Sequence, residues 1–339
     1  MKKRSYESFW AQLHSRARLS GTPLRAMFEL TYRCNFRCRH CYIPPAYKRK
    51  YALRELSTKE VFAVLDQLKG AGCLFLGFTG GEPLLRRDFP DICGYARRAG
   101  FEVIIYTNGS LIDEEKAGQL RRIGPNKVDI TLPAVSPAVF DAVCGIKGGC
   151  GRVLRAVDHL RSRGVPVGLK TCVLKANAGE MDKIRAFAVS RGLSLRVDPV
   201  LLRRWDGSDK PQRYRQMSLP GDVQAGSCGS GERAAGRNKE ELFACGAGLS
   251  QCAITPAGEL KMCVMIDHPG SGILESSFSS CWGKMRDETR RLNQRKGYIC
   301  SVCPRRPDCA WCPARGWLKS GDFSAPDCSG ILVGDDEKR

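Results

Sequence analysis

The stretch Glu29-Leu-Thr-Tyr-Arg-Cys-Asn-Phe-Arg-Cys-Arg-His-Cys-Tyr42 carries three cysteines, Cys34, Cys38 and Cys41, in the spacing C-x3-C-x2-C. It overlaps the end of a run, residues 25–31, that predicts a strand. Three thiolates on one short loop can hold three corners of an iron–sulfur cube. A [4Fe–4S] cluster normally takes four protein thiolates, so one iron is left open to another ligand. The spacing therefore favours a cluster with an open metal position.

Zinc is the alternative metal for such a loop. A structural zinc site usually takes a fourth Cys or His close by. The only nearby candidate is His40, which sits between Arg39 and Cys41 and is too cramped to share a metal easily with its neighbour. The loop by itself therefore favours iron over zinc.

The cysteine content bears on the compartment. The chain has 339 residues and 18 cysteines, but its first residues contain no apolar segment that could act as a signal peptide. No apolar run approaches the roughly 20 residues needed to cross a bilayer. We therefore expect a reducing, cytoplasmic setting without membrane attachment, in which cysteines serve metal binding or catalysis rather than disulfides.

The net charge of +20, from 55 Lys and Arg against 35 Asp and Glu, indicates an anionic partner. Nucleic acid is disfavoured, because no basic run is interleaved with aromatic residues as strand binding prefers. An acidic peptide, or an acidic electron donor of the flavodoxin or ferredoxin type, fits equally well.

The first two-thirds of the chain alternates predicted strands and helices. A capping box, Ser57-Thr-Lys-Glu60, starts a helix whose apolar positions fall on one face. About six such units predict an α/β fold with a parallel sheet, a partial (β/α)6 barrel, whose active site gathers at the carboxyl ends of the strands. The expected strands are Arg25–Thr31, Cys73–Thr79, Phe101–Thr107, Lys127–Leu132, Val165–Val173 and Leu193–Val197.

We expect four parts in the chain. They are an N-terminal extension (1–23), the partial barrel (24–202), a polar linker (203–241) and a small Cys-rich iron–sulfur domain (242–339). The linker is rich in Gly, Ser and charge and lacks a clear hydrophobic period, which is typical of a connecting loop.

The cysteine loop after the first strand, together with Gly80-Gly-Glu-Pro83 after the second, resembles the radical S-adenosylmethionine (radical SAM) superfamily over residues 24–200. The resemblance implies that Cys34, Cys38 and Cys41 hold a [4Fe–4S] cluster and that SAM fills the open iron. It also implies reductive cleavage of SAM to a 5′-deoxyadenosyl radical. The residues expected around SAM are Tyr42, Gly80, Gly81, Glu82, Pro83, Asn108 and Thr131.

The sequence departs from the family at two positions expected to contact the ribose and the carboxylate of SAM. Related enzymes often read Ser-Leu-Asp-Gly where this chain has Thr131-Leu-Pro-Ala134, and Arg-Gly where it has Cys144-Gly145. Lys170 and Asp198, on or just after late strands, could point into the barrel beside SAM. They are weak catalytic candidates, and a buried structural ion pair explains them at least as well.

The last hundred residues contain enough cysteines for two four-thiolate sites. Zinc ribbons are the alternative, since C-x2-C pairs also suit zinc. The order C-x12-G-x4-C, then C-x2-C-x5-C-x2-C and a final Cys resembles the SPASM extension of radical SAM enzymes. By that resemblance one auxiliary [4Fe–4S] cluster is bound by Cys245, Cys252, Cys263 and Cys312, and the other by Cys300, Cys303, Cys309 and Cys328. The pair Cys309 and Cys312 is spaced x2 where the family usually shows x3, and the alternative assignment exchanges ligands between the two clusters.

The resemblance implies oxidation or cross-linking of a side chain in a ribosomally made peptide or protein. Val264, where the sulfatase-maturing branch carries Asp, counts against that branch. Oxidation or decarboxylation of a tetrapyrrole or other small molecule is the alternative within enzymes, and a zinc-stabilised nucleic-acid-binding protein is the alternative outside them. The segment before the first strand is short, so we expect a separate protein to bind the leader of any peptide substrate.

Overall fold

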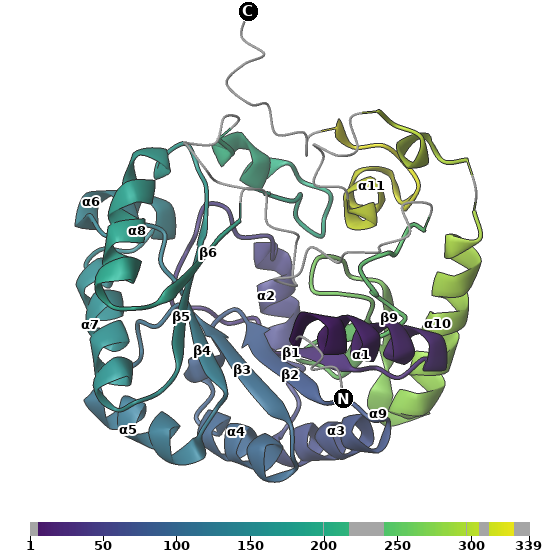
Figure 1. The fold of residues 1–339 in the computed structure, drawn as a ribbon, viewed down its shortest axis with the longest axis horizontal. Coiled ribbons are helices and arrows are strands. Elements are labelled where there is room, and N and C mark those ends of the chain that lie inside the picture. Colours follow the sequence, from purple (N-terminus) through teal and green to yellow (C-terminus); the bar gives the residue numbers. More distant parts are fainter. Residues whose placement is uncertain (1–5, 199, 217–240, 296, 305–311, 329–339) are drawn as a thin grey trace, which may run out of the picture.

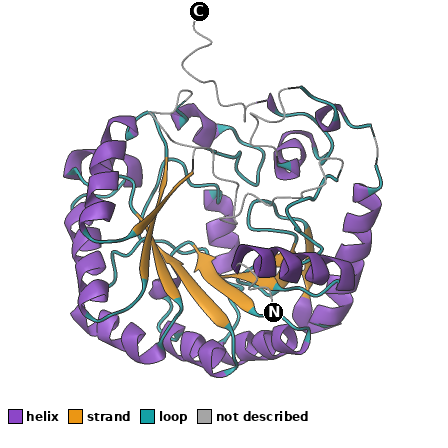
Figure 2. Ribbon diagram, in the orientation of Figure 1, coloured by secondary structure: helices purple, strands orange, loops and turns teal. Residues whose placement is uncertain are grey.

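The computed structural model describes residues 6–198, 200–216, 241–295, 297–304 and 312–328. Within them the strands form one nine-stranded sheet (Figures 1 and 2). The strand order is β6-β5-β4-β3-β2-β1-β7-β8-β9. The strands are β1 (Arg25–Thr31), β2 (Phe75–Gly80), β3 (Glu102–Thr107), β4 (Lys127–Thr131), β5 (Val167–Cys172), β6 (Ser194–Asp198), β7 (Gln251–Ile254), β8 (Glu259–Lys261) and β9 (Pro269–Gly272).

The strands β1 to β6 are all parallel, and helices follow them along the outside of the curved sheet (Figure 1). This is the predicted α/β partial barrel, with each predicted strand found within two residues of its expected ends. The helices are α1 (Tyr6–Ser20), α2 (Pro45–Ala52), α3 (Thr58–Gly70), α4 (Phe89–Arg98), α5 (Glu114–Ile123), α6 (Pro137–Cys144), α7 (Gly149–Ser162), α8 (Met181–Ser190), α9 (Ile273–Ser276), α10 (Phe278–Asn293) and α11 (Pro313–Ser320).

Helix α3 shows how local sequence sets an element. The Ser57 hydroxyl accepts a hydrogen bond from the Glu60 amide at 3.4 Å, and the Glu60 carboxylate accepts one from the Ser57 amide at 2.7 Å. This is the predicted capping box, which satisfies amides at the helix start. Val61, Val64, Leu65 and Leu68 are buried, as their helical spacing predicts.

The C-terminal segment joins the barrel sheet, which sequence analysis did not predict. Strand β7 pairs with β1 in parallel, and β8 and β9 continue the sheet in antiparallel pairing. Phe278 and Trp282 on α10 are buried in the same core as the barrel residues, and the Trp282 indole donates to the Gly21 carbonyl at 2.7 Å. Residues 251–285 therefore share the core of the barrel.

A buried ion pair holds β8 to β1. The Nζ of Lys261 lies 2.7 Å from Oε2 of Glu29, and both side chains are fully buried. The Tyr32 hydroxyl donates to the same oxygen at 2.9 Å, and the Lys261 ammonium lies 4.0 Å from the centre of the Trp205 ring. Burial raises the pKa of Glu29, while Lys261 opposes that rise. The two charges are therefore stabilised by their ion pair, by the Tyr32 hydrogen bond and by the Trp205 ring.

Within the described residues, no helix combines the length and the apolar composition that a membrane crossing requires.

Replacing Lys261 by Met leaves a buried carboxylate without its cation. We expect it to lower the free energy of unfolding by about 3 kcal/mol, in the range found when one partner of a buried pair is removed. Arg185→Gln is the matched control, because Asp182, its partner, is 92% exposed and such pairs contribute about 1 kcal/mol or less. Anaerobic urea unfolding followed by tryptophan fluorescence measures the free energy of unfolding of both variants. Equal, small decreases in the two variants would contradict the importance of the buried pair.

Candidate functional site

The three-cysteine loop lies at the carboxyl end of β1, with Cys34, Cys38 and Cys41 partly buried. Backbone hydrogen bonds fix it to the end of α6: the amide of Arg37 donates to the Cys144 carbonyl at 2.9 Å, and that of Arg39 donates to the carbonyl one residue earlier at 3.1 Å. These two contacts flank Cys38. The loop is thus held from the far side of the barrel as well as by its own strand.

Gly80 and Gly81 are required by a close backbone approach to this loop. A Cβ on Gly80 would lie 2.1 Å from the Thr31 carbonyl oxygen, and a Cβ on Gly81 would lie 2.2 Å from that of Arg33. Gly80 also has a φ of 131°, which side chains rarely adopt. The amide of Gly81 donates to the Thr31 carbonyl at 2.7 Å. The glycines therefore let β2 continue its pairing into the cysteine loop.

Glu82 is fully buried and organises the neighbouring strand end. Its carboxylate accepts hydrogen bonds from the Thr107 hydroxyl at 2.7 Å, the Asn108 amide at 2.7 Å and the Leu84 amide at 3.1 Å. Burial raises the pKa of Glu82, and these donors oppose the rise. An ionised carboxylate has about four acceptor positions, so three are used within the protein and one remains for a cationic ligand group.

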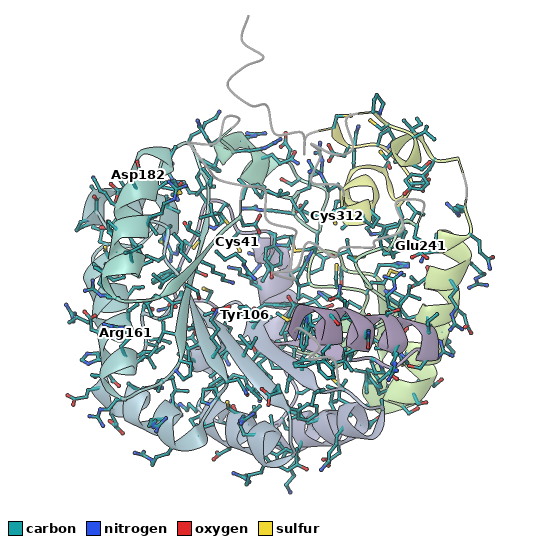
Figure 3. All side chains as sticks on the ribbon, viewed as in Figure 1. Cys41, Tyr106, Arg161, Asp182, Glu241 and Cys312 are labelled. Carbon is teal, nitrogen blue, oxygen red and sulfur yellow. The ribbon has the colours of Figure 1, made fainter. Side chains whose placement is uncertain are left out.

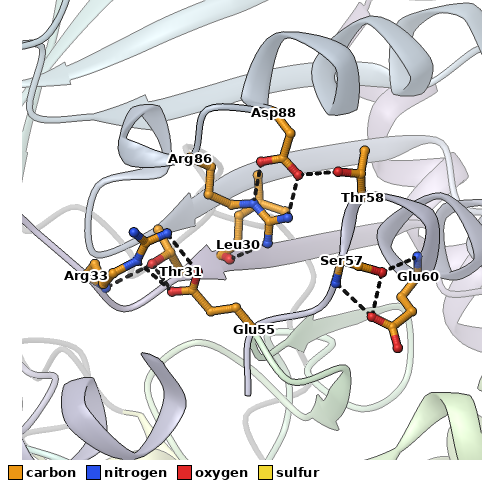
Figure 4. Close-up of polar contacts among 9 residues, drawn as sticks. All are labelled: Leu30, Thr31, Arg33, Glu55, Ser57, Thr58, Glu60, Arg86 and Asp88. Carbon is orange, nitrogen blue, oxygen red and sulfur yellow. Dashed lines mark hydrogen bonds and ion pairs between the residues drawn. The ribbon is translucent and has the colours of Figure 1, made fainter. Parts of the chain in front are cut away.

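The near side of the loop is braced by residues before α3 and α4 (Figure 4). Arg33 donates to the Glu55 carboxylate at 2.8 Å, and Thr31 also hydrogen-bonds Glu55. Arg86, which is nearly buried, donates to the Leu30 carbonyl at 3.2 Å and pairs with Asp88. The strand end that carries the cysteines is therefore fixed on both sides.

The other residues expected around SAM surround the same end of the sheet. Pro83, buried, begins the short helix η1 (Pro83–Leu85) directly after Glu82. The side-chain amide of Asn108 donates to the Asn35 side-chain oxygen at 2.9 Å, which ties the end of β3 to the cysteine loop. Thr131 ends β4 and is partly exposed.

Trp205 connects the cysteine loop to the C-terminal segment. Its amide donates to the Tyr42 carbonyl at 3.4 Å, its ring lies 5.5 Å from the Tyr42 ring, and its indole donates to the Val264 carbonyl at 3.2 Å. Beside it, the Arg204 guanidinium donates to the Cys41 carbonyl at 3.2 Å. Residues 203–216 were expected to begin a plain linker, but Trp205 is buried between two cysteine-bearing segments.

Lys170 and Asp198, the weak catalytic candidates, lie near the carboxyl ends of β5 and β6. Burial, and then the charge of Arg196, lowers the pKa of Lys170, while burial raises that of Asp198. The two groups make no ion pair of 4.0 Å or less with each other, so the simple buried pair considered from sequence is not present between them.

Three of the four thiols expected for one auxiliary cluster, those of Cys245, Cys263 and Cys312, act on one another electrostatically. Burial raises the pKa of Cys312 to about 12, and the nearby thiols of Cys245 and Cys263 add to the rise. Cys252 is placed differently: it is buried on β7, its pKa is raised by burial and then by Cys73, and its thiol contacts the Arg25 carbonyl at 4.0 Å.

The thiols expected for the second auxiliary cluster are described only in part. Cys300 and Cys303 are partly buried around the short helix η4 (Ile299–Ser301), and Cys328 is exposed. Cys309 lies outside the described residues.

The residues at the end of β1 fit a [4Fe–4S] cluster. Three thiols lie on one loop. The backbone at the start of this loop packs so closely against Gly80 and Gly81 that a Cβ on either glycine would collide with it. Burial raises the pKa of Cys34 to about 11, so metal binding there must release a proton. In the described part of the chain, no three His, Cys, Asp or Glu side chains converge on a position for a single metal ion.

Comparison with known proteins matches residues 28–188 to the Radical SAM superfamily. PqqA peptide cyclase from Streptomyces rochei is 27% identical to this chain, with 91% of this chain and 89% of that protein covered. Fe-coproporphyrin III synthase from Methanosarcina barkeri (strain Fusaro / DSM 804) is 35% identical over 158 residues, which are 47% of this chain and 39% of that protein.

Solved structures of Streptococcus suis SuiB share the fold. SuiB bound to S-adenosylmethionine matches with a TM-score of 0.67 and 15% identity, covering 98% of this chain and 84% of SuiB. SuiB bound to precursor peptide SuiA matches with a TM-score of 0.64 and 14% identity, covering 98% and 82%. The likeness confirms the α/β partial barrel expected from the sequence.

Replacing Gly81 by Ala should push the cysteine loop away from β2. We expect the variant to keep its secondary structure but to lose about 4 iron atoms per chain after anaerobic reconstitution, the content of one cluster. Gly70→Ala is the control, because nothing lies within 4 Å of a Cβ there. Circular dichroism and iron analysis measure the outcome, and a Gly81→Ala protein with full iron content would refute the need for this close approach.

Proposed function

We propose that this enzyme, whose residues 28–188 match the Radical SAM superfamily, cleaves SAM reductively and uses the resulting radical to oxidise or cross-link a side chain of a ribosomally made peptide or protein. The observation that carries the proposal is the direct backbone pairing of the three-cysteine loop with Gly80–Glu82 at the carboxyl ends of β1 and β2. A specific cluster loop and a specific SAM motif thereby meet in one place.

The residues at this site have separate roles. Cys34, Cys38 and Cys41 would hold a [4Fe–4S] cluster, which when bound and reduced supplies the electron that splits SAM into methionine and a 5′-deoxyadenosyl radical. The remaining acceptor position of the Glu82 carboxylate suits the ammonium of SAM. Tyr42, held against Trp205, would border the adenine. The protein therefore contributes orientation and exclusion of water.

A peptide substrate is supported by how much of the chain its relatives share. The similarity to PqqA peptide cyclase extends over nine-tenths of the chain, including the C-terminal segment, and the SuiB fold binds a precursor peptide. Oxidation or decarboxylation of a tetrapyrrole is the second candidate. It is favoured by the higher identity to Fe-coproporphyrin III synthase, although that match spans only 39% of the relative.

We also propose two auxiliary [4Fe–4S] clusters in the C-terminal segment. The first is supported by Cys245, Cys263 and Cys312, whose thiols influence one another. Cys252, expected as the fourth ligand by resemblance, is buried on β7, where its thiol contacts the Arg25 carbonyl. The second cluster, with Cys300, Cys303, Cys309 and Cys328, rests on sequence resemblance alone.

The net charge of +20 supports an acidic partner, such as a flavodoxin or ferredoxin that delivers the electron. The abundance of free thiols supports a reducing, cytoplasmic setting. A separate protein that binds a peptide leader stays a prediction.

The SAM-cleavage proposal has a direct test. With dithionite and SAM, the anaerobically reconstituted protein should release 5′-deoxyadenosine and methionine even without substrate, because the open iron lies on the Cys34–Cys38–Cys41 loop. The triple Cys→Ala variant should release neither, while keeping the iron of its other clusters. Chromatography of the products measures this, and equal cleavage by both proteins removes the loop from catalysis.

Iron counting tests the first auxiliary cluster. Cys312→Ala should lower the iron content by about 4 atoms from about 12 per chain, because its thiol lies with those of Cys245 and Cys263. Cys252→Ala should leave the iron unchanged, because its side chain is packed in the sheet core. Cys281→Ala, another buried thiol, is the matched control. A loss of iron in Cys252→Ala, but not in Cys281→Ala, would restore Cys252 as a ligand.

A further inference from the structure

Two cationic side chains stand directly opposite each other on the inner face of the barrel sheet. Lys170 on β5 and Arg196 on β6 are register partners, so they point to the same face of adjacent strands about 4.8 Å apart. Leu169 and Thr171, which alternate with Lys170, are buried on the other face, toward the outer helices. Lys170 and Arg196 therefore both belong to the inner face.

The inner face continues onto β3 at Tyr106. Figure 3 shows Tyr106 inside the curve of the sheet, whereas Arg161 and Asp182 lie on the outer ring of helices. The Lys170 ammonium lies 4.8 Å from the centre of the Tyr106 ring. Burial raises the pKa of Tyr106, and the nearby charge of Arg196 opposes that rise. The aromatic ring thus lies beside both cations without supplying a negative charge.

Nearby carboxylates do not neutralise the pair at short range. Among the described residues, no ion pair of 4.0 Å or less includes Lys170 or Arg196. Asp129, on β4, is paired with Lys127 at 2.8 Å. Asp198 lies two residues beyond Arg196 and accepts a hydrogen bond from the Val200 amide at 3.0 Å. The Lys170 charge also reaches the Glu82 carboxylate, but that carboxylate already accepts three hydrogen bonds, so among the described residues neither cation has a carboxylate at ion-pair distance.

The pair lies between the cysteine loop and the open edge of the barrel. The charge of Lys170 reaches both His40 on the loop and the Glu82 carboxylate. Arg196 is on β6, the edge strand of the sheet and the barrel strand farthest in order from β1. A group bound by the two cations would therefore lie between the cysteine loop and the edge strand of the sheet.

We propose that Lys170 and Arg196 form a binding site for a carboxylate group of the substrate, which deepens the proposed function and rests on it. An Arg guanidinium can grip a carboxylate with two parallel hydrogen bonds, and an ammonium adds a point charge. The site selects for an acidic residue, or a chain-terminal carboxylate, next to the reacting position.

Binding of small probes to the reconstituted, SAM-loaded protein tests the site without turnover. N-acetyl-glutamate α-amide carries the carboxylate, and N-acetyl-glutamine α-amide is its neutral counterpart. By ligand-observed NMR, the wild-type protein should bind the acid at least tenfold more tightly than the amide. Lys170→Met and Arg196→Gln should each bring that ratio near one, while Lys170→Arg should retain most of it. Lys183→Met, on the outer surface, is the control and should keep the full preference.

Calorimetry of SAM binding to the same proteins shows whether Lys170 and Arg196 bind the carboxylate of the substrate or that of SAM. The proposal requires SAM affinity within threefold of wild type in both variants. Loss of SAM affinity with an unchanged acid preference would assign the pair to the cofactor and overturn the proposal. The proposal would also be overturned if the wild-type protein bound the acid no more tightly than the amide. That result does not depend on whether the variants fold. Because neither measurement needs SAM cleavage, these failures are distinct from failure of the proposed function.

Discussion

The close backbone approach between the ends of β1 and β2 is the constraint on which the rest of the site depends. Thr31 and Arg33 accept hydrogen bonds from Gly81 and Glu82 at 2.7 and 2.9 Å, an arrangement that leaves no room for a side chain at Gly80 or Gly81. The loop that carries the cysteines is thereby an extension of the sheet rather than a free connection. Its position follows from strand pairing, which buried, hydrogen-bonded backbone groups enforce.

A second set of contacts brings the C-terminal segment to that loop. Lys261 and Glu29 form a dry ion pair between β8 and β1, and the ring of Trp205 covers the ammonium while its indole bonds Val264. Val264 follows Cys263, and Tyr42 follows Cys41, so one indole contacts the neighbours of both cysteines. The geometry between the two thiol groups is therefore set by packed side chains before any metal is considered.

The sequence indicated the barrel and its main loop well, because their signals are local. The capping box at Ser57, the spacing of the first three cysteines and the Gly80–Pro83 motif each depend on neighbouring residues. The attachment of β7 to β1 could not be found in this way, because pairing partners far apart in sequence leave no periodic trace. From the sequence alone, Lys261 is expected on the surface, because its buried partner Glu29 is far away in the chain. Trp205 lies in a polar stretch of sequence, so its burial could not be predicted either. Cys252 is expected as a ligand from the resemblance to the SPASM extension alone, and a cysteine on a buried strand is equally a small core side chain.

The pairing of β7 with β1 has a consequence for how the molecule is made. Strand β1 emerges from the ribosome first among the strands, yet one of its edges waits for residues 251–254 near the end of the chain. Contacts between such distant segments form slowly, because the intervening chain must be ordered first. The strand that carries the cysteine loop is therefore paired on one side by β2 early and on the other side only once residues 251–254 have been made. A nascent chain that stops before residue 251 would carry these thiols on a sheet with an exposed edge.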